Sequence, residues 1–118
     1  MHNCVLLVDD EAEVRENLRE FLELYGYDVT VAENGRRALE VVQTDPPCMV
    51  LLDLIMPVMD GWDFLSIVEQ EGIGGDMQIV ISTSAPEKAP TQLPLLAKPV
   101  DLNELLRVVE GACRATGA

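Results

Sequence analysis

The sequence predicts an α/β fold, in which a central parallel sheet lies between two layers of helices. Short apolar runs alternate with longer segments of helical periodicity, which is the pattern of repeated β-α units. Several runs end abruptly at a charged or hydroxyl residue, as buried parallel strands do where they leave the sheet. The chain of 118 residues is long enough for one hydrophobic core and too short for two. We therefore expect a single domain over residues 1–118.

Five apolar runs are the candidate strands, and they cover residues 4–8, 28–32, 48–53, 78–83 and 94–97. The third is apolar until Asp53, which predicts a strand buried along its whole length. The second alternates only weakly between polar and apolar residues.

Four segments have helical periodicity, and they cover residues 11–25, 37–43, 60–71 and 100–114. Gly26 provides a stop for the first helix, Pro46 and Pro47 end the second, and Asp101 is the expected N-cap of the last. The residues expected to face the core are Val14, Leu18, Phe21, Leu22, Tyr25, Ala38, Leu39, Val42, Trp62, Leu65, Val68, Leu105, Val108 and Val109.

The order of the strands follows from two general rules. Crossovers between parallel strands are right-handed, and a single switch point places the first and third strands side by side. We therefore expect a flavodoxin-like (βα)5 three-layer sandwich with a five-stranded parallel sheet in the order 2-1-3-4-5.

Polar residues stand where four of these strands end. Asp9 and Asp10 follow the first strand, Asp53 ends the third, Thr83 ends the fourth, and Lys98 follows the fifth. In an open α/β sheet, ligands bind outside the carboxyl ends of the strands. The sequence therefore predicts that three carboxylates, one hydroxyl and one ammonium meet at one place, a set that suits a divalent cation and a phosphoryl group.

The predicted carboxylate cluster needs a positive partner. Two carboxylates about 5 Å apart repel by roughly 3 kcal/mol at an effective dielectric constant of about 20. Such a cluster either raises a pKa or binds a cation, and hard oxygen ligands select Mg²⁺ or Mn²⁺. One carboxylate oxygen can then act as a nucleophile toward phosphorus, while Lys98 and Thr83 meet the remaining phosphoryl oxygens.

The chain resembles the receiver domain of two-component response regulators. The resemblance rests on strand-end residues together with the loop after the third strand, and it spans essentially the whole chain. The matching residues are Asp9-Asp10-Glu11, Asp53, Met56-Pro57, Asp60-Gly61, Thr83 and Lys98-Pro99.

The resemblance implies a role for each matching residue. Asp53 would be the phosphoacceptor, and the metal would be bound by Asp10, Asp53 and the carbonyl of Ile55, with Asp9 acting through a water molecule. Thr83 would be the switch hydroxyl, and Lys98 would pair with the phosphoryl group. Pro57, Gly61 and Pro99 would shape the site, the last after a cis peptide bond.

The resemblance also implies partners. The phosphodonor would be a histidine kinase or a histidine phosphotransfer protein, and the output would be a changed interaction with a downstream protein. The chain would be a signalling phosphoacceptor that catalyses only its own phosphorylation and dephosphorylation, and not an enzyme acting on other substrates.

Two features depart from the family. Residues 84–97 are too few for a full fourth helix, and Pro86, Pro90 and Pro94 would limit any helix to one or two turns. Leu95 stands where the family commonly has Tyr or Phe. We therefore expect an intact chemical site beside a shortened or missing fourth helix.

Three other classes of function share parts of this pattern. Metal-dependent phosphatases with an Asp nucleophile carry a DxD motif on one strand and need a cap or a larger core, and the sequence offers none of these. Flavodoxin-type carriers need a Ser/Thr/Gly-rich phosphate loop after the first strand, where this sequence has acidic residues. A pseudo-receiver, which binds proteins without being phosphorylated, stays open because of the shortened segment.

Composition limits the partners and the compartment. The net charge of −13 argues against nucleic acid and anionic membranes as direct partners. No apolar stretch approaches the roughly 18 residues of a membrane span, and the N-terminus lacks a signal-peptide pattern. The three cysteines form no CxxC pair, so we expect a reducing cytoplasm, with Cys4 and Cys48 acting as small core residues. A monomer is expected.

Overall fold

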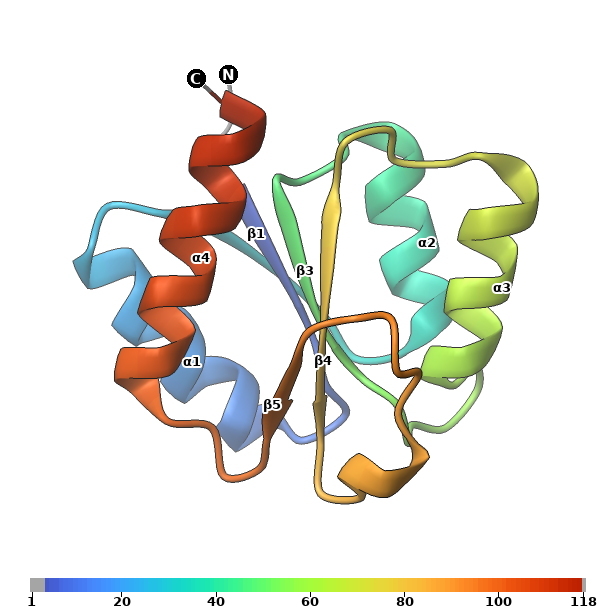
Figure 1. Ribbon diagram of the computed structural model, residues 1–118, viewed down its shortest axis with the longest axis horizontal. Helices are drawn as coiled ribbons and strands as arrows, with labels where there is room; N and C mark the ends of the chain where they lie inside the picture. The colour runs from blue at the N-terminus through green and yellow to red at the C-terminus, as the bar shows by residue number, and fades with distance from the viewer. Residues whose placement is uncertain (1–3, 118) are drawn as a thin grey trace.

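The computed structural model describes residues 4–117, which form a three-layer α/β sandwich (Figure 1). The parallel sheet has the order β2-β1-β3-β4-β5, which confirms the predicted flavodoxin-like topology. Its strands are β1 (Cys4–Val8), β2 (Asp28–Ala32), β3 (Met49–Asp53), β4 (Gln78–Thr83) and β5 (Leu95–Ala97). Helices α1 (Ala12–Leu24) and α4 (Leu102–Gly117) cover one face, and α2 (Gly35–Thr44) and α3 (Gly61–Glu71) cover the other.

The register of the strands brings their carboxyl ends level. Val8 of β1 is paired with Leu52 of β3, so Asp9 and Asp53 follow as neighbours across the same edge of the sheet. Thr83 of β4 is paired with Ala97 of β5, and the amide of Lys98 donates to the Thr83 carbonyl at 2.9 Å. The residues predicted to gather at this edge are therefore delivered there by backbone pairing.

Successive residues of the central strands face opposite layers, which divides the core in two. Val5 and Leu7 pack toward α1 and α4, whereas Leu6 and Val8 pack toward α2 and α3. Each central strand is therefore buried on both faces, as its continuous apolar sequence predicts.

Two helix positions differ from the predicted pattern. Tyr25 was expected to face the core but is 56% exposed, because α1 has ended and Tyr25 is its C-cap residue. In α3 the buried stripe is Gly61, Phe64 and Val68, while Trp62 is 37% exposed. The rotation of α3 is set by Gly61, where a Cβ atom would lie 2.7 Å from the backbone of the preceding loop.

The segment between β4 and β5 contains only a single 3₁₀ turn, Pro86–Lys88, with Pro86 in its first turn. This confirms the prediction of a shortened fourth helix. Ala89 and Leu93 are partly buried against the core on the α2–α3 side, so the shortened segment still covers part of the sheet.

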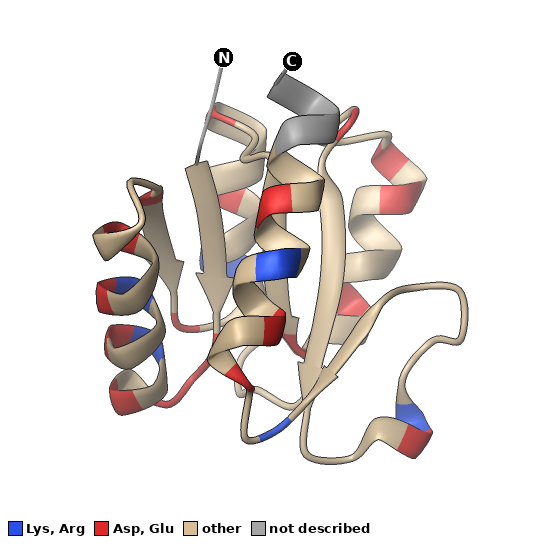
Figure 2. Cartoon of the chain, turned by 60° about the vertical axis from the view of Figure 1, so that its left-hand side comes forward, with Lys and Arg blue, Asp and Glu red and all other residues tan. Residues whose placement is uncertain are grey.

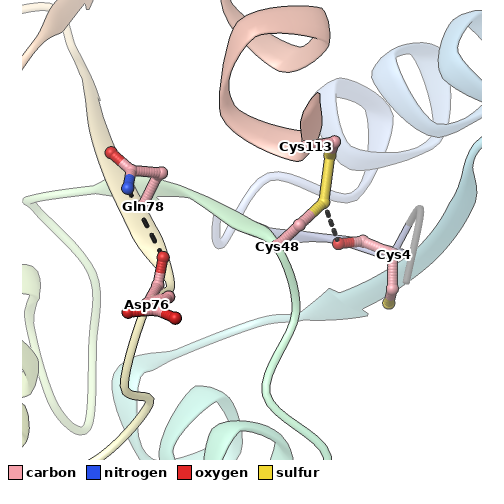
Figure 3. The surroundings of a disulfide bond; sticks show 5 residues. All are labelled: Cys4, Cys48, Asp76, Gln78 and Cys113. Atoms are coloured by element: carbon pink, nitrogen blue, oxygen red, sulfur yellow. Dashed lines mark hydrogen bonds between the residues drawn. A yellow bond between two sulfur atoms is a disulfide. The ribbon is translucent and has the colours of Figure 1, made fainter. Parts of the chain in front are cut away.

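The cysteines were expected to belong to a protein of a reducing compartment rather than to a disulfide scaffold, but two of the three are crosslinked. Cys48, which directly precedes β3, forms a disulfide with Cys113 of α4, with a Cα–Cα distance of 5.0 Å (Figure 3). Both are buried, as expected for Cys48, and Cys4 remains a free thiol. The two residues are 65 positions apart, and only the packing of α4 against β3 brings them together.

Acidic residues occur on every helix and on several loops (Figure 2). None of the helices that the structure describes combines the length and apolar character of a bilayer-spanning segment.

Candidate functional site

Three carboxylates meet at the carboxyl edge of the sheet. Asp9 and Asp10 lie in the turn between β1 and α1, and Asp53 is the last residue of β3. One oxygen from each lies within 4.8 Å of the others. Asp9 and Asp53 are each 5% exposed, whereas Asp10 is exposed to solvent. The structure thus brings together the acidic residues that the sequence predicted.

Lys98 places its ammonium group among these carboxylates. Its Nζ lies 2.7 Å from Asp9 Oδ2 and 3.4 Å from Asp53 Oδ2, with a longer approach of 3.8 Å to Glu11 Oε1. Lys98 comes directly before Pro99, and the peptide bond between them is cis, as predicted. The two buried carboxylates therefore share one partly buried cation.

The surroundings shift the pKa values of both partners. Burial raises the pKa of Asp53, and the charge of Asp9 adds to this, while Lys98 opposes it. Burial tends to lower the pKa of Lys98, but the hydrogen bond and charge of Asp9, together with the charge of Asp53, raise it overall. The fold thus disfavours the charged form of Asp53 and favours the charged form of Lys98.

Backbone and side-chain hydrogen bonds orient the carboxylates. The amide of Glu11 donates to Asp9 Oδ1 at 2.8 Å, and the amide of Ile55 donates to Asp53 Oδ1 at 3.2 Å. The Oδ2 atoms of Asp9 and Asp53 are consequently the ones that face Lys98.

Arg15 is a contributor that the sequence interpretation missed. Its Nη1 donates to the carbonyl oxygen of Asp9 at 2.7 Å from one turn into α1, which ties the helix to the acidic turn. The signal that could have revealed it is an arginine four residues after Glu11, within reach of the turn that precedes the helix.

The two hydroxyl residues at the end of β4, Thr83 and Ser84, differ in their exposure to solvent. Thr83 is 1% exposed, and its hydroxyl oxygen accepts a hydrogen bond from the amide of Ala85 at 3.0 Å. Ser84, which follows it, is exposed and lines the cavity beside Asp53 and Lys98. The register of Thr83 is as predicted, and a second hydroxyl stands at the mouth of the site.

A cavity of about 830 Å³ opens from the acidic cluster. Its polar end is formed by Asp10, Glu11, Asp53, Ser84 and Lys98. Its apolar flank runs between α1 and the start of α4 and is lined by Val14, Leu18, Pro99, Val100 and Leu102. A phosphoryl-bearing group could therefore reach Asp53 while its carrier rests on apolar surface.

The loop after β3 is held close to the end of that strand. A Cβ atom on Gly61 would lie 2.7 Å from the carbonyl oxygen of Asp53, so only glycine permits this approach. Pro57 accepts a hydrogen bond from the amide of Met59 at 2.8 Å, and Val58 between them has a φ of 70°. Trp62 does not line the cavity at the acidic cluster and instead lines a separate hollow with Pro90 and Leu93.

The residues present fit a divalent cation. Three carboxylates converge within 4.8 Å, and exposed Asp10 and the open cavity leave a path for a hydrated ion. Within the described residues, this is the group of acidic, histidine and cysteine side chains whose spacing suits a metal.

Comparisons with known proteins agree with this geometry. A family model described as the response regulator receiver domain matches residues 5–110. The response regulator MprA of Mycolicibacterium vanbaalenii is 36% identical over 95% of this chain, which spans about half (51%) of that protein's length. The Francisella response regulator 1452 receiver domain superposes with a TM-score of 0.83 at 25% identity, covering 96% of this chain and 98% of that one.

A third protein is relevant to the acidic cluster. The response regulator protein TrrA of Thermotoga maritima, solved in complex with Mg(2+)-BeF, superposes with a TM-score of 0.79 at 27% identity, covering 92% of this chain and 97% of that one. The topology, the strand-end acidic cluster and the family match over residues 5–110 all agree. The chain belongs to the response regulator receiver domain family.

Proposed function

We propose that this receiver domain accepts a phosphoryl group on Asp53 from a phosphohistidine in a histidine kinase or a histidine phosphotransfer protein. The observation that carries the proposal is the position of the Asp53 carboxylate. It lies within 4.8 Å of two further carboxylates and 3.4 Å from the partly buried ammonium of Lys98, at the end of an open cavity.

Mg²⁺ or Mn²⁺ would be held by Asp10, Asp53 and the carbonyl of Ile55. Bound there, the cation supplies positive charge for the phosphoryl oxygens and offsets the repulsion between carboxylates. Asp9 fits an indirect role through a water molecule, because one of its oxygens accepts the amide of Glu11 and the other pairs with Lys98.

The chemistry on Asp53 is a displacement at phosphorus. A carboxylate oxygen attacks the phosphorus as the bond to the donor imidazole nitrogen breaks, and the nitrogen keeps the electron pair of that bond. The products are an acyl phosphate and, with one proton taken up by the imidazole from solvent, a neutral histidine. Oδ1 is held by the amide of Ile55, so Oδ2 is the oxygen left facing Lys98. Lys98 then pairs with a phosphoryl oxygen, since its ammonium is already within reach of Asp53.

Thr83 would act as the switch hydroxyl. Its oxygen accepts the amide of Ala85, which leaves its proton free to be donated to a phosphoryl oxygen. That donation would pull the loop after β4 toward the phosphoryl group, and the 3₁₀ turn, which directly follows this loop, would move with it.

Incubation with acetyl phosphate and Mg²⁺ tests the proposal. We expect the intact mass to rise by one phosphoryl group, about 80 Da, in the wild type and not in Asp53→Asn, because an amide cannot replace the carboxylate nucleophile. Addition of a metal chelator should abolish the modification. An unmodified wild-type protein that still binds Mg²⁺ would favour a pseudo-receiver that acts through protein binding alone.

A further inference from the structure

The disulfide lies far from the acidic cluster, at the opposite end of the same strand. Cys48 precedes β3 and Asp53 ends it, so the two are five residues apart, about 16 Å along an extended strand. A change in the state of the cysteines can therefore occur without altering a direct contact of the acidic site.

The disulfide fixes the C-terminal half of α4 to the sheet. Leu105, Val109 and Cys113 form the buried stripe of this helix at intervals of four residues, and each is at most 5% exposed. Among the residues of α4 whose burial the structure describes, Cys113 is the buried one furthest along the helix, and Gly111 lies two residues before it. Because glycine weakens a helix interior, we expect the crosslink to contribute to the order of these turns.

The surroundings also suit the reduced form of Cys48. Its Sγ lies 3.1 Å from the carbonyl oxygen of Cys4 (Figure 3). A thiol at this position would donate a hydrogen bond to that carbonyl, so reduction would not leave a buried donor without a partner. The strand end can therefore accommodate both oxidation states.

The third cysteine, Cys4, is not placed to form a disulfide with Cys48 or Cys113 in their stead. The Cys4 sulfur points away from the disulfide in Figure 3 and contacts the Thr30 hydroxyl at 3.7 Å. Its burial raises the pKa of the thiol, with a smaller lowering from Thr30, so the reactive thiolate is disfavoured. Cys48 and Cys113 thus form a defined pair with no adjacent resolving thiol.

We propose that Cys48 and Cys113 are a reversible thiol modification site, in which exchange with dithiol or disulfide partners releases or fixes the C-terminal turns of α4. In the reducing direction, one thiolate of a dithiol attacks a protein sulfur and forms a mixed disulfide. Its second thiolate then closes the reductant's own disulfide. Two electrons and two protons pass to the protein, which gains two thiols, and the reverse exchange with a small disulfide restores the crosslink.

Counting thiols on the whole chain tests whether the pair exists and reverses. After air oxidation, unfolding in N-ethylmaleimide should add one label, on Cys4, and after dithiothreitol it should add three. Oxidised glutathione added to the reduced, folded protein should return the count to one. In Cys4→Ser the counts should be zero and two. Three labels on the oxidised protein, a crosslink that includes Cys4, or failure to reform would overturn the proposal.

Amide hydrogen exchange tests the consequence for the helix. Reduction should speed exchange of the amides of residues 109–113 by at least about tenfold, while the α2–α3 side changes little. The Cys48→Ala/Cys113→Ala variant should exchange like the reduced protein under either condition. Equal exchange in oxidised and reduced wild type would refute the coupling to α4. Phosphorylation by acetyl phosphate is measured on the same samples, so failure of one proposal is distinguishable from failure of the other.

Discussion

Neutralising Lys98 and neutralising Asp53 should change the free energy of unfolding in opposite directions when no divalent cation is present. At an effective dielectric constant of about 20, the attraction across the 3.4 Å between Lys98 and Asp53 is about 5 kcal/mol. Asp9 and Asp10, with oxygens within 4.8 Å, each repel Asp53 by about 3.5 kcal/mol at that dielectric constant. At this dielectric constant the two repulsions exceed the attraction by about 2 kcal/mol. Water screening of exposed Asp10 reduces this excess and burial of the Asp53 carboxylate adds to it, so the net effect of the Asp53 charge is unfavourable by about 1–2 kcal/mol.

Asp53→Asn should therefore raise the free energy of unfolding by about 1–2 kcal/mol. Lys98→Met should lower it by about 3–5 kcal/mol, because it leaves two buried carboxylates without their cation. For a domain of this size, each kcal/mol corresponds to roughly 4 °C in the melting temperature. Excess Mg²⁺ should restore much of the loss in Lys98→Met, since a bound cation replaces the missing charge.

Urea unfolding in a chelating buffer is the assay, with the double variant completing a thermodynamic cycle. In the Lys98→Met background, Asp53→Asn should give a larger gain than in the wild type, because the change then removes only repulsion. A destabilised Asp53→Asn, or a Lys98→Met variant with wild-type stability, would show that the electrostatic reasoning is wrong.

Three further predictions follow from the same region. Arg15→Met removes a charged hydrogen bond to the Asp9 carbonyl, so it should lower the free energy of unfolding by about 1.5–3 kcal/mol and weaken Mg²⁺ binding in NMR titrations. Arg19→Met is the control, because Arg19 contacts Glu16 instead, and it should leave Mg²⁺ binding unchanged. Gly61→Ala should destabilise by about 1–3 kcal/mol in thermal melts, because its Cβ would lie 2.7 Å from backbone atoms, whereas Gly111→Ala meets open space and should not destabilise. Because the pKa of Asp53 is raised in the folded state, its protonation stabilises the fold; this contribution is complete below the unfolded pKa and is lost as pH rises through the folded pKa. The free energy of unfolding of the metal-free wild type should therefore rise on mild acidification, and that of Asp53→Asn should rise less. The raised pKa of Lys98 gives a second loss only above its ordinary value of 10.5, and urea titrations from pH 4 to 11 would measure both.

The strand order and the acidic cluster could be predicted because both depend on local signals. Apolar runs mark buried strands, and the residue that ends each run is placed by the parallel register at one edge of the sheet. Asp9, Asp53 and Lys98 are therefore positioned by rules that need no knowledge of side-chain packing.

The parts that could not be predicted depend on tertiary packing. Phe64 is buried in place of Trp62 because the approach of Gly61 to the backbone fixes the rotation of α3, and periodicity alone does not give that rotation. The disulfide needs the axial position of α4 along β3, for which cysteine spacing carries no signal. The contact of the Thr83 hydroxyl with its own loop likewise depends on how the chain turns after β4.

The shortened segment after β4 and the strand β3 should differ in how readily they tolerate changes in length. Residues 84–94 form one 3₁₀ turn and otherwise irregular chain, so insertions there can be absorbed at the surface. A residue added to or removed from β3 would turn the side chains of part of the strand to the opposite face of the sheet, and it would also shift Asp53 relative to Cys48. Related sequences should therefore vary freely in length between Thr83 and Pro94, while keeping four residues between the positions of Cys48 and Asp53.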